Sequence, residues 1–146
     1  MAHVHGYAIG AGFQLALAAD LRVAALDAWF AMRETSLGLV PDLAGTGPLV
    51  HLVGYARALE ICATGRRVSA PEAHSIGLVG SLAPAADLDE TTGSLVEALL
   101  AAPAPALRAL KPLLRGAVHG DRDAQLGHER EAQAGLLQTM LGRADG

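Results

Sequence analysis

A glycine-rich turn near the beginning of the chain limits most tightly what this sequence can fold into. Glycine occurs at positions 6, 10 and 12, and a run of leucine and alanine follows at residues 15–19. This order is typical of a strand that turns sharply into a helix. The first N–H groups of a helix lack an intrahelical acceptor and lie at the positive end of the helix dipole, so they can bind an oxygen atom. The small residues Gly10, Ala11 and Gly12 would let a ligand approach that backbone.

Such a turn also occurs where a helix only packs on a sheet, so the turn alone leaves both interpretations open. A lone acidic residue, Glu34, follows Gln14 by twenty positions. A carboxylate beside an oxyanion-binding turn can carry a proton to and from a substrate. We expect such a carboxylate to lie in an apolar pocket that excludes water, because such a pocket raises its pKa towards neutral pH. The competing interpretation of Glu34 is a solvated loop acid. Several apolar residues near it could form the wall of the pocket: Trp29, Phe30, Leu37, Leu39 and Val40.

The length and composition of the chain exclude several classes of protein. A length of 146 residues suits one domain with a hydrophobic core. No apolar run is long enough to cross a membrane, no signal peptide is visible, and the single cysteine, Cys62, excludes an internal disulfide framework. We therefore expect a cytoplasmic protein without a membrane partner. A net charge of −4 and only 3% aromatic residues argue against nucleic-acid binding, and the six histidines lack the spacing of a metal site.

The composition of the chain changes at about residue 83. Residues 1–83 alternate short apolar runs with glycine turns and helices, which predicts an α/β fold with strands at 2–4, 21–25 and 78–82. A helix is predicted at 55–63 and ends before Gly65. Ser69 and Glu72 form a capping box, with Pro71 in the first turn of a helix that ends at Gly77.

Residues 84–146 are predicted to be helical, with helices at 88–100, 106–118 and 121–141. Pro112 should kink or end the middle helix, because proline has no N–H to donate and its ring clashes with the preceding turn. On the last helix, five residues fall roughly on one face: Leu126, Gln133, Leu137, Met140 and Leu141. This face either packs on the core of the chain itself or contacts another subunit.

Four motifs, in order, resemble the crotonase (enoyl-CoA hydratase/isomerase) superfamily. Residues 5–12, His-Gly-Tyr-Ala-Ile-Gly-Ala-Gly, are similar to its N-G-Y-A-x-G-G-G turn, and residues 19–24 resemble its C-D-x-x-x-A strand. Residues 34–46 resemble the E-x-x-x-G-x-x-P-x-x-G-(G)-T loop, and residues 64–79 resemble T-G-x-x-x-S-A-x-x-A-x-x-x-G-L-V. The resemblance covers about residues 3–83 and is weaker beyond them.

The resemblance implies a particular fold and chemistry. Members of this superfamily fold as a spiral of ββα turns followed by a helical region that trimerises, so residues 1–83 would belong to the spiral and residues 84–146 would form the oligomerisation region of a homotrimer or hexamer. They bind acyl-CoA thioesters and stabilise an enolate with two backbone N–H groups, and the N–H of Ala11 matches one of these donors. Coenzyme A is part of the substrate, and neither a metal nor a redox cofactor is implied.

Two residues indicate which reaction to expect. Hydratases of the superfamily use two glutamates, and this sequence has the second as Glu34 but carries Gln14 at the position of the first. An amide can hold a water molecule or an acyl oxygen, but it does not exchange a proton at neutral pH. We therefore expect one-base isomerisation of 3-enoyl-CoA to 2-enoyl-CoA, with Glu34 as the proton shuttle and Gln14 as a polar positioning group. Hydration of 2-enoyl-CoA remains an alternative.

Asp42 raises a further alternative. It follows Glu34 by eight residues, a spacing found in the dienoyl-CoA isomerases of the superfamily, although these also have an acid at the position of Gln14. An aspartate that follows a proline is also an ordinary turn residue. Both interpretations of Asp42 stay open at the level of the sequence.

The sequence begins at the glycine turn, whereas members of the superfamily have a further N-terminal half before it. That half supplies the second oxyanion donor and most contacts to the CoA nucleotide. The chain would then be a fragment, the product of a misplaced start, or one half of a split protein. We expect enzymatic activity when an N-terminal half is present. The rival interpretation is a non-catalytic acyl-CoA-binding or assembly module, because Gln14 replaces an acid.

Overall fold

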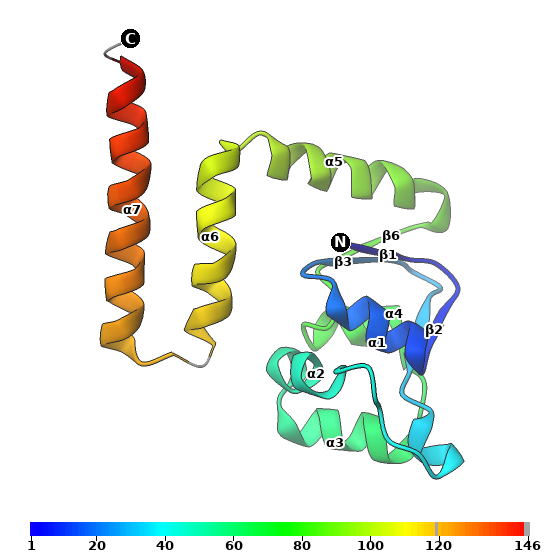
Figure 1. The fold of residues 1–146 in the computed structure, drawn as a ribbon. Helices are drawn as coiled ribbons and strands as arrows, with labels where there is room; N and C mark the ends of the chain where they lie inside the picture. Colours follow the sequence, from blue (N-terminus) through cyan, green and yellow to red (C-terminus); the bar gives the residue numbers. More distant parts are fainter. Residues whose placement is uncertain (119, 145–146) are drawn as a thin grey trace. The chain divides into compact units, whose positions relative to one another are not determined.

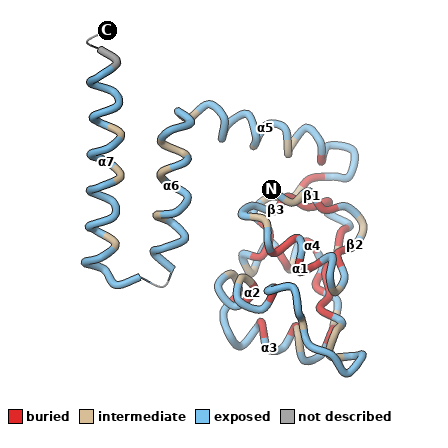
Figure 2. Tube along the Cα trace, viewed as in Figure 1, coloured by how far each residue is buried: buried red, intermediate tan, exposed pale blue. Residues whose placement is uncertain are grey.

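The computed structural model describes residues 1–118 and 120–144. The chain forms two compact units, Met1–Leu95 and Val96–Gly146, which divide inside helix α5 (Leu88–Leu100). The composition boundary expected from the sequence lies earlier, near residue 83. Two small sheets and the buried residues belong to the first unit, and two long helices make up most of the second (Figure 1, Figure 2).

The two sheets of the first unit each have three short strands. The first sheet is parallel and has the order β1 (Ala2–Val4), β3 (Arg22–Ala25), β6 (Ser81–Ala83). The second has the order β2 (Tyr7–Ile9), β4 (Trp29–Ala31), β5 (Val68–Ser69), with β2 parallel and β5 antiparallel to β4. Helix α1 (Ala11–Ala18) follows β2 directly and leads back to β3 in the first sheet.

The other helices of the first unit are short. They are η1 (Glu34–Leu37), α2 (Thr46–Val53), α3 (Tyr55–Thr64), α4 (Ala70–Ser75) and η2 (Ala85–Asp87). Helix α3 ends at Gly65, whose left-handed φ of 58° lets its N–H reach the carbonyl oxygen of Ile61. The Ser69 side chain accepts the N–H of Glu72 at 3.3 Å and so caps α4. The predicted roles of Gly65 at the end of α3 and of Ser69 at the start of α4 are both confirmed.

Two of the three predicted strands are confirmed closely, and the third is shifted. The strands at 2–4 and 21–25 correspond to β1 and β3, whereas the strand predicted at 78–82 begins only at Ser81. The reason is that the N–H groups of Leu78 and Val79 both donate to the carbonyl oxygen of Ala73, at 2.8 and 3.2 Å. N–H groups that close the end of α4 cannot pair with a neighbouring strand.

One hydrophobic core holds the first unit together. Phe13 of α1 packs against Phe30 of β4 with ring centroids 5.3 Å apart, and both side chains are fully buried. All four residues of β3 are buried, as expected for the central strand of a parallel sheet. Figure 2 shows the buried residues gathered on the sheets and on the helix faces that cover them. This packing fixes where β2 and β4 end.

Arg22 of β3 is a charged residue inside this core. Its guanidinium donates to the carbonyl oxygens of Leu78 at 2.6 Å and Ala16 at 3.3 Å, and also to that of Ala19. Burial lowers the pKa of Arg22, and the nearby Asp20 opposes that effect. A cation is favourable at the C-terminal end of a helix, where carbonyl groups lack partners. Arg22 therefore ties the end of α1 to the segment that follows α4.

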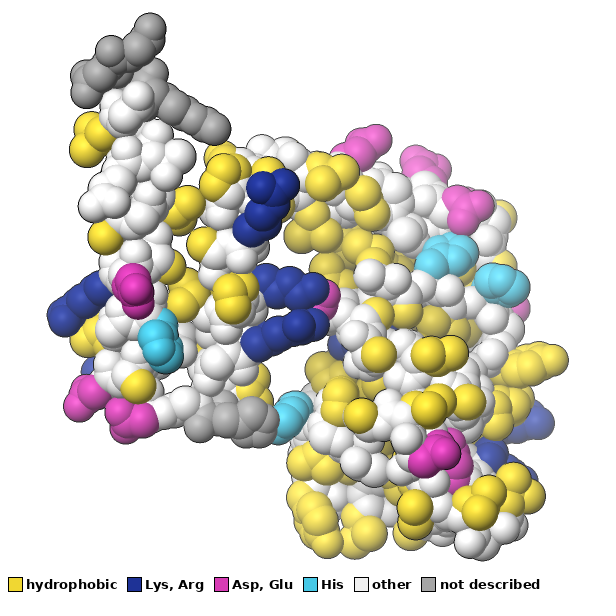
Figure 3. Space-filling view, in the orientation of Figure 1, with side chains coloured by type: hydrophobic (Ala, Val, Ile, Leu, Met, Phe, Trp, Pro, Cys, Tyr) yellow, Lys and Arg dark blue, Asp and Glu magenta, His cyan; other side chains and the backbone are white. Residues whose placement is uncertain are grey.

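The second unit contains two helices joined by a short connection, α6 (Ala104–Ala117) and α7 (Arg122–Ala144). The sequence predicts that Pro112 kinks or ends its helix, and α6 does not end there but continues to Ala117. The amide of Gln125 donates to the carbonyl oxygen of Leu113 at 3.1 Å. Hydrophobic side chains are visible along both helices in Figure 3, and none of residues 96–118 and 120–142 is fully buried.

No single helix among the described residues is long and apolar enough to cross a membrane. The bent pair Ala85–Leu100 and Ala104–Ala117 has the length and apolar composition of a span only when its two helices are taken together.

Candidate active site

The glycine turn connects β2 to α1 as the sequence predicts. Gly10 follows β2 and has φ 52° and ψ −118°, a backbone conformation that favours glycine. Its N–H donates to the carbonyl oxygen of Ala31 at 2.8 Å, and its carbonyl oxygen accepts the N–H of Gln14 at 3.0 Å. Ala11 is the first residue of α1, so its N–H belongs to the turn of the helix that lacks intrahelical acceptors. Ala11 and Gly12 are both exposed.

The structure brings Gln14 and Glu34 together. Nε2 of Gln14 lies 2.6 Å from Oε1 of Glu34, although the two residues are twenty positions apart. Gln14 is only 1% exposed. Its other amide atom, Oε1, accepts the N–H of Leu43 at 2.8 Å and that of Gly45 at 3.4 Å.

These contacts fix the orientation of the amide. A backbone N–H can only donate, so the oxygen of Gln14 must face Leu43 and Gly45, and its NH₂ group must face Glu34. Oε1 of Glu34 is therefore a hydrogen-bond acceptor. Sequence analysis did not identify Leu43 and Gly45 as part of the site, because they contribute only backbone groups.

The second carboxylate oxygen of Glu34, Oε2, is the atom that we expect to accept a proton. Oε2 is buried and has no hydrogen-bond partner among the described residues. A buried acceptor without a donor is costly in a folded protein, so such an atom indicates a place where a proton or a ligand belongs. The carboxylate lies beside the turn, since a Cβ added to Gly10 would be 3.4 Å from Oε1 of Glu34.

Glu34 opens the short helix η1, which is anchored on α3. The hydroxyl of Thr35 donates to the carbonyl oxygen of Cys62. A Cβ at Gly65 would lie 2.6 Å from the hydroxyl oxygen of Ser36, so the two segments are in close contact. Burial raises the pKa of the Cys62 thiol, and the negative charge of Glu34 raises it further. The pKa of the Cys62 thiol therefore depends on the charge of Glu34.

The apolar wall expected from the sequence does not form as predicted. Phe30 is buried in the core, but Leu37, Leu39 and Val40 are 75%, 61% and 73% exposed. These three residues lie at and after the end of η1, which is capped by Gly38 with a left-handed φ of 74°, and all of residues 36–40 are exposed. Trp29 instead stacks against Arg67, with the guanidinium carbon 4.1 Å from the ring centroid.

Asp42 lies apart from the pair formed by Gln14 and Glu34. It is exposed, in the loop between η1 and α2. In the described part of the chain no hydrogen bond or ion pair connects it to either residue. No group of three or more His, Cys, Asp or Glu side chains suited to a metal ion occurs among the described residues.

The arrangement can stabilise negative charge on an oxygen and move a proton beside it. The first N–H groups of α1 follow Gly10 directly, and the carboxylate of Glu34 lies beside the same glycine. Only one group of this pair can take up and release a proton, because its partner is an amide. The geometry suits acid–base chemistry with a single carboxylate.

Comparison with known proteins gives consistent results. The family model for enoyl-CoA hydratase/isomerase matches residues 1–144. A carnitinyl-CoA dehydratase of Salmonella typhi is 43% identical over 115 residues, which is 79% of this chain and 44% of that protein.

Solved structures show the same fold. A protein of Thermobifida fusca YX assigned as an enoyl-CoA hydratase, solved with CoA, matches with a TM-score of 0.92 and 47% identity over 94% of this chain and 53% of its own. The structure with acetoacetyl-CoA matches with a TM-score of 0.90 and 48% identity, over 92% of this chain and 52% of its own. The chain thus spans about half the length of the relatives it matches. It belongs to the enoyl-CoA hydratase/isomerase family, the crotonase superfamily.

Proposed function

We propose that the protein containing this chain isomerises 3-enoyl-CoA thioesters to 2-enoyl-CoA thioesters, with Glu34 as its only acid–base group. The observation that carries this proposal is the hydrogen bond of 2.6 Å from Nε2 of Gln14 to Oε1 of Glu34. It places an amide where a second acid would be needed for a two-base reaction. It also leaves Oε2 of Glu34, which is buried and without a partner in the described residues, as the proton acceptor.

The reaction needs one carboxylate and an oxyanion site. Oε2 of Glu34 takes a proton from C2 of the substrate, which breaks the C2–H bond and forms an enolate. The N–H of Ala11 donates to the thioester oxygen while negative charge develops there, and one such donor is typically worth about 100–1,000-fold in rate. The protonated Glu34 then returns the proton to C4, and the double bond moves from C3–C4 to C2–C3. The carboxylate is regenerated, so no co-reactant is consumed.

Gln14 positions the base. Its NH₂ group donates to one oxygen of Glu34, and its own oxygen is held by the N–H groups of Leu43 and Gly45. This holds the carboxylate in one orientation, with Oε2 directed to the substrate. A hydration reaction needs a group that activates water and a group that handles the proton on carbon, and an amide fills neither role by proton transfer.

The comparisons support an acyl-CoA substrate, because the similar Thermobifida fusca structures contain CoA and acetoacetyl-CoA. Coenzyme A would enter only as part of the substrate. Since the chain spans about half of these relatives, we propose that the remaining half supplies the second oxyanion donor and contacts to the nucleotide. We also propose a cytoplasmic homo-oligomer, trimer or hexamer, assembled through the helical residues 84–146.

A second candidate function is hydration or dehydration. The names of the relatives favour it, since one is a carnitinyl-CoA dehydratase and others are described as enoyl-CoA hydratases. Glu34 would then have to serve both proton transfers while Gln14 only holds the water. A dienoyl-CoA isomerase is less favoured, because Asp42 is exposed and makes no hydrogen bond to Glu34 among the described residues.

The test uses the complete protein that contains this chain. The absorbance of the conjugated enoyl thioester should rise with 3-enoyl-CoA and change little with 2-enoyl-CoA and water. Glu34→Gln should abolish the signal, whereas Asp42→Asn should retain it. Gln14→Glu should add hydration of 2-enoyl-CoA, because it supplies the missing acid. Isomerisation that survives Glu34→Gln would contradict the proposal, and no turnover in the native protein would favour a non-catalytic acyl-CoA-binding module.

A further inference from the structure

The sheet formed by β2, β4 and β5 has two faces with different surroundings. Successive side chains of a strand point to opposite faces, so Trp29 lies on the face opposite Phe30 of β4. Phe30 is buried against Phe13 of α1, whereas Trp29 is half-buried and stacks with Tyr7 of the paired strand, ring centroids 5.6 Å apart. The face away from α1 is therefore aromatic and partly open.

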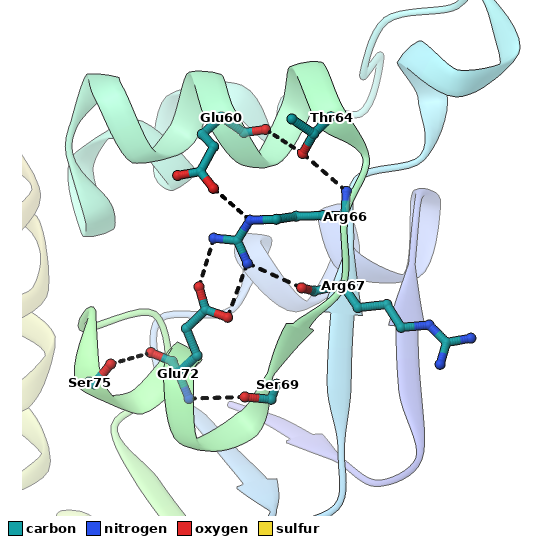
Figure 4. Close-up of polar contacts among 7 residues, drawn as sticks. All are labelled: Glu60, Thr64, Arg66, Arg67, Ser69, Glu72 and Ser75. Carbon is teal, nitrogen blue, oxygen red and sulfur yellow. Dashed lines mark hydrogen bonds and ion pairs between the residues drawn. The ribbon is translucent and has the colours of Figure 1, made fainter.

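Arg66 and Arg67 are neighbours in the sequence, but of the two only Arg66 is paired with acidic residues among those that the structure describes. Arg66 forms ion pairs with Glu60 and Glu72, each at 2.7 Å. Figure 4 shows the side chain of Arg67 pointing away from this cluster. The guanidinium of Arg67 lies over the ring of Trp29, 4.1 Å from its centroid.

Arg67 and a third arginine line one cavity on the open face. The cavity has a volume of about 250 Å³ and is lined by Ile9, Trp29, Arg33 and Arg67. Nη1 of Arg33 donates to the carbonyl oxygen of Gly65 at 3.3 Å, which leaves its other N–H groups for a ligand. None of the ion pairs in residues 1–118 and 120–144 involves Arg33 or Arg67.

Charge and size indicate the class of ligand. Two guanidinium groups without a carboxylate partner repel each other, and an anion between them removes that repulsion. The planar guanidinium matches a carboxylate in geometry and can donate two N–H bonds to it. A cavity of about 250 Å³ exceeds a single small ion, since one water takes about 30 Å³ of liquid volume. Ile9 and Trp29 provide apolar surface for the remaining volume.

We propose that this cavity binds a small carboxylate that carries a short apolar chain. Arg33 and Arg67 hold the carboxylate, and Ile9 and Trp29 contact the chain. Glu34 does not line this cavity, and its side chain lies against Gly10 and Gln14. The proposal therefore does not depend on the isomerase activity. The carboxylate comes either from a free acid or from the far end of an acyl group on CoA.

The fluorescence of Trp29, the single tryptophan of the sequence, reports directly on this cavity. We would titrate the native chain with hexanoate, with the neutral isostere hexan-1-ol, and with acetate, which lacks the chain. Hexanoate should give a saturable change. Hexan-1-ol should bind at least about tenfold more weakly, because one charge-assisted contact is worth about that factor. Acetate should also bind more weakly than hexanoate, because it has no chain to bury against Ile9 and Trp29. Equal binding of hexanoate and hexan-1-ol would overturn the proposal.

Substitutions separate the site from general charge effects. Arg33→Gln and Arg67→Gln should each weaken hexanoate binding about tenfold or more, measured by calorimetry because Arg67→Gln also changes the surroundings of Trp29. The matched control is Arg57→Gln, which removes an exposed arginine of α3. Arg67→Lys keeps the charge but loses the planar fork, so it should also bind more weakly. Arg33→Gln and Arg67→Gln variants that fold and bind like Arg57→Gln would overturn the proposal.

Competition identifies the source of the carboxylate. Glutaryl-CoA carries a carboxylate at the far end of its acyl chain, and butyryl-CoA has a similar chain without one. Displacement of hexanoate by glutaryl-CoA alone would assign the site to the acyl group, and displacement by neither would assign it to a free acid. Displacement by both equally would show that the phosphates of CoA occupy the cavity, which would contradict the carboxylate assignment.

Discussion

Two features of the structure disfavour any residue larger than glycine at position 10: its backbone conformation and the nearby carboxylate of Glu34. The φ of 52° with ψ of −118° at Gly10 favours glycine, and a Cβ would lie 3.4 Å from Oε1 of Glu34. We expect Gly10→Ala to lower the free energy of unfolding by about 1–3 kcal/mol. Urea unfolding of the native chain measures this change.

The matched control for this substitution is Gly12, two residues further along. A Cβ at Gly12 meets nothing within 4 Å, and the residue lies inside α1. Gly12→Ala should therefore raise the free energy of unfolding by up to about 1 kcal/mol, since alanine favours helix more than glycine. Equal effects of the two substitutions would show that the turn at Gly10 is not constrained as described.

Cys62 provides a chemical probe of the charge on Glu34. Burial raises the pKa of this thiol first, and the negative charge of Glu34 raises it second. An acid whose pKa rises on folding contributes stability below its unfolded pKa, and that contribution is lost as the pH rises through its folded pKa. At mildly alkaline pH we expect slow reaction of the native thiol with a disulfide reagent, because the thiolate is the reactive form.

Glu34→Gln should accelerate this reaction of Cys62, because it removes the second cause of the raised pKa. Asp42→Asn is the control and should leave the rate unchanged, since Asp42 is not a cause of the shift. Cys62 is the single cysteine of the sequence, so the rate needs no correction for other thiols. An unchanged rate in Glu34→Gln would show that Glu34 does not contribute to the raised pKa of Cys62.

At the scale of elements, Arg66 connects α3 to α4. Its guanidinium pairs with Glu60 of α3 and makes two hydrogen bonds to Glu72 of α4, at 2.7 and 3.0 Å (Figure 4). The hydrogen bond from Arg66 lowers the pKa of Glu72. A carboxyl group with a lowered pKa adds stability above its unfolded pKa, and that stability is lost as the pH falls through its folded pKa.

We therefore expect Arg66→Met to lower the free energy of unfolding at pH 7 by about 1 kcal/mol or less, because each side chain of the cluster is a third or more exposed. The difference from the native chain should disappear in acid below the folded pKa of Glu72. Arg57→Met is the control, since this exposed arginine of α3 lies outside the cluster. Urea unfolding at the two pH values gives the comparison, and a difference that does not depend on pH would contradict the assignment.

Helix ends could be predicted from single residues, whereas contacts between distant segments could not. Gly65 and Ser69 act on neighbouring backbone groups, so the sequence shows their roles directly. The orientation of Gln14 depends on the N–H of Leu43, which is 29 residues away and has no side-chain signal. The sequence identifies Glu34 through a family motif, but it does not show that one of its oxygens lacks a partner. The exposure of Leu37, at 75%, depends on which segments pack near η1, and no local sequence pattern shows that.

At the scale of the whole molecule, the second unit leaves apolar surface uncovered. Leu137, Met140 and Leu141 of α7 are 48%, 68% and 66% exposed, and an apolar cavity of about 390 Å³ lies between α6 and α7. Large exposed apolar surfaces on a folded protein usually mark an interface. The three residues occupy part of the face that the sequence predicts for α7. Contact with a second copy of the chain would cover this surface.

We expect the native chain to self-associate through this surface, with a mass by light scattering of a trimer or hexamer. Leu137→Glu combined with Met140→Glu should shift the mass towards the monomer, because two charges would be buried without partners in the interface. Leu59→Glu is the control, since Leu59 is a similarly exposed leucine on α3 of the first unit. A monomer in the native chain, or an unchanged oligomer after the double substitution, would show that these helices do not carry the assembly.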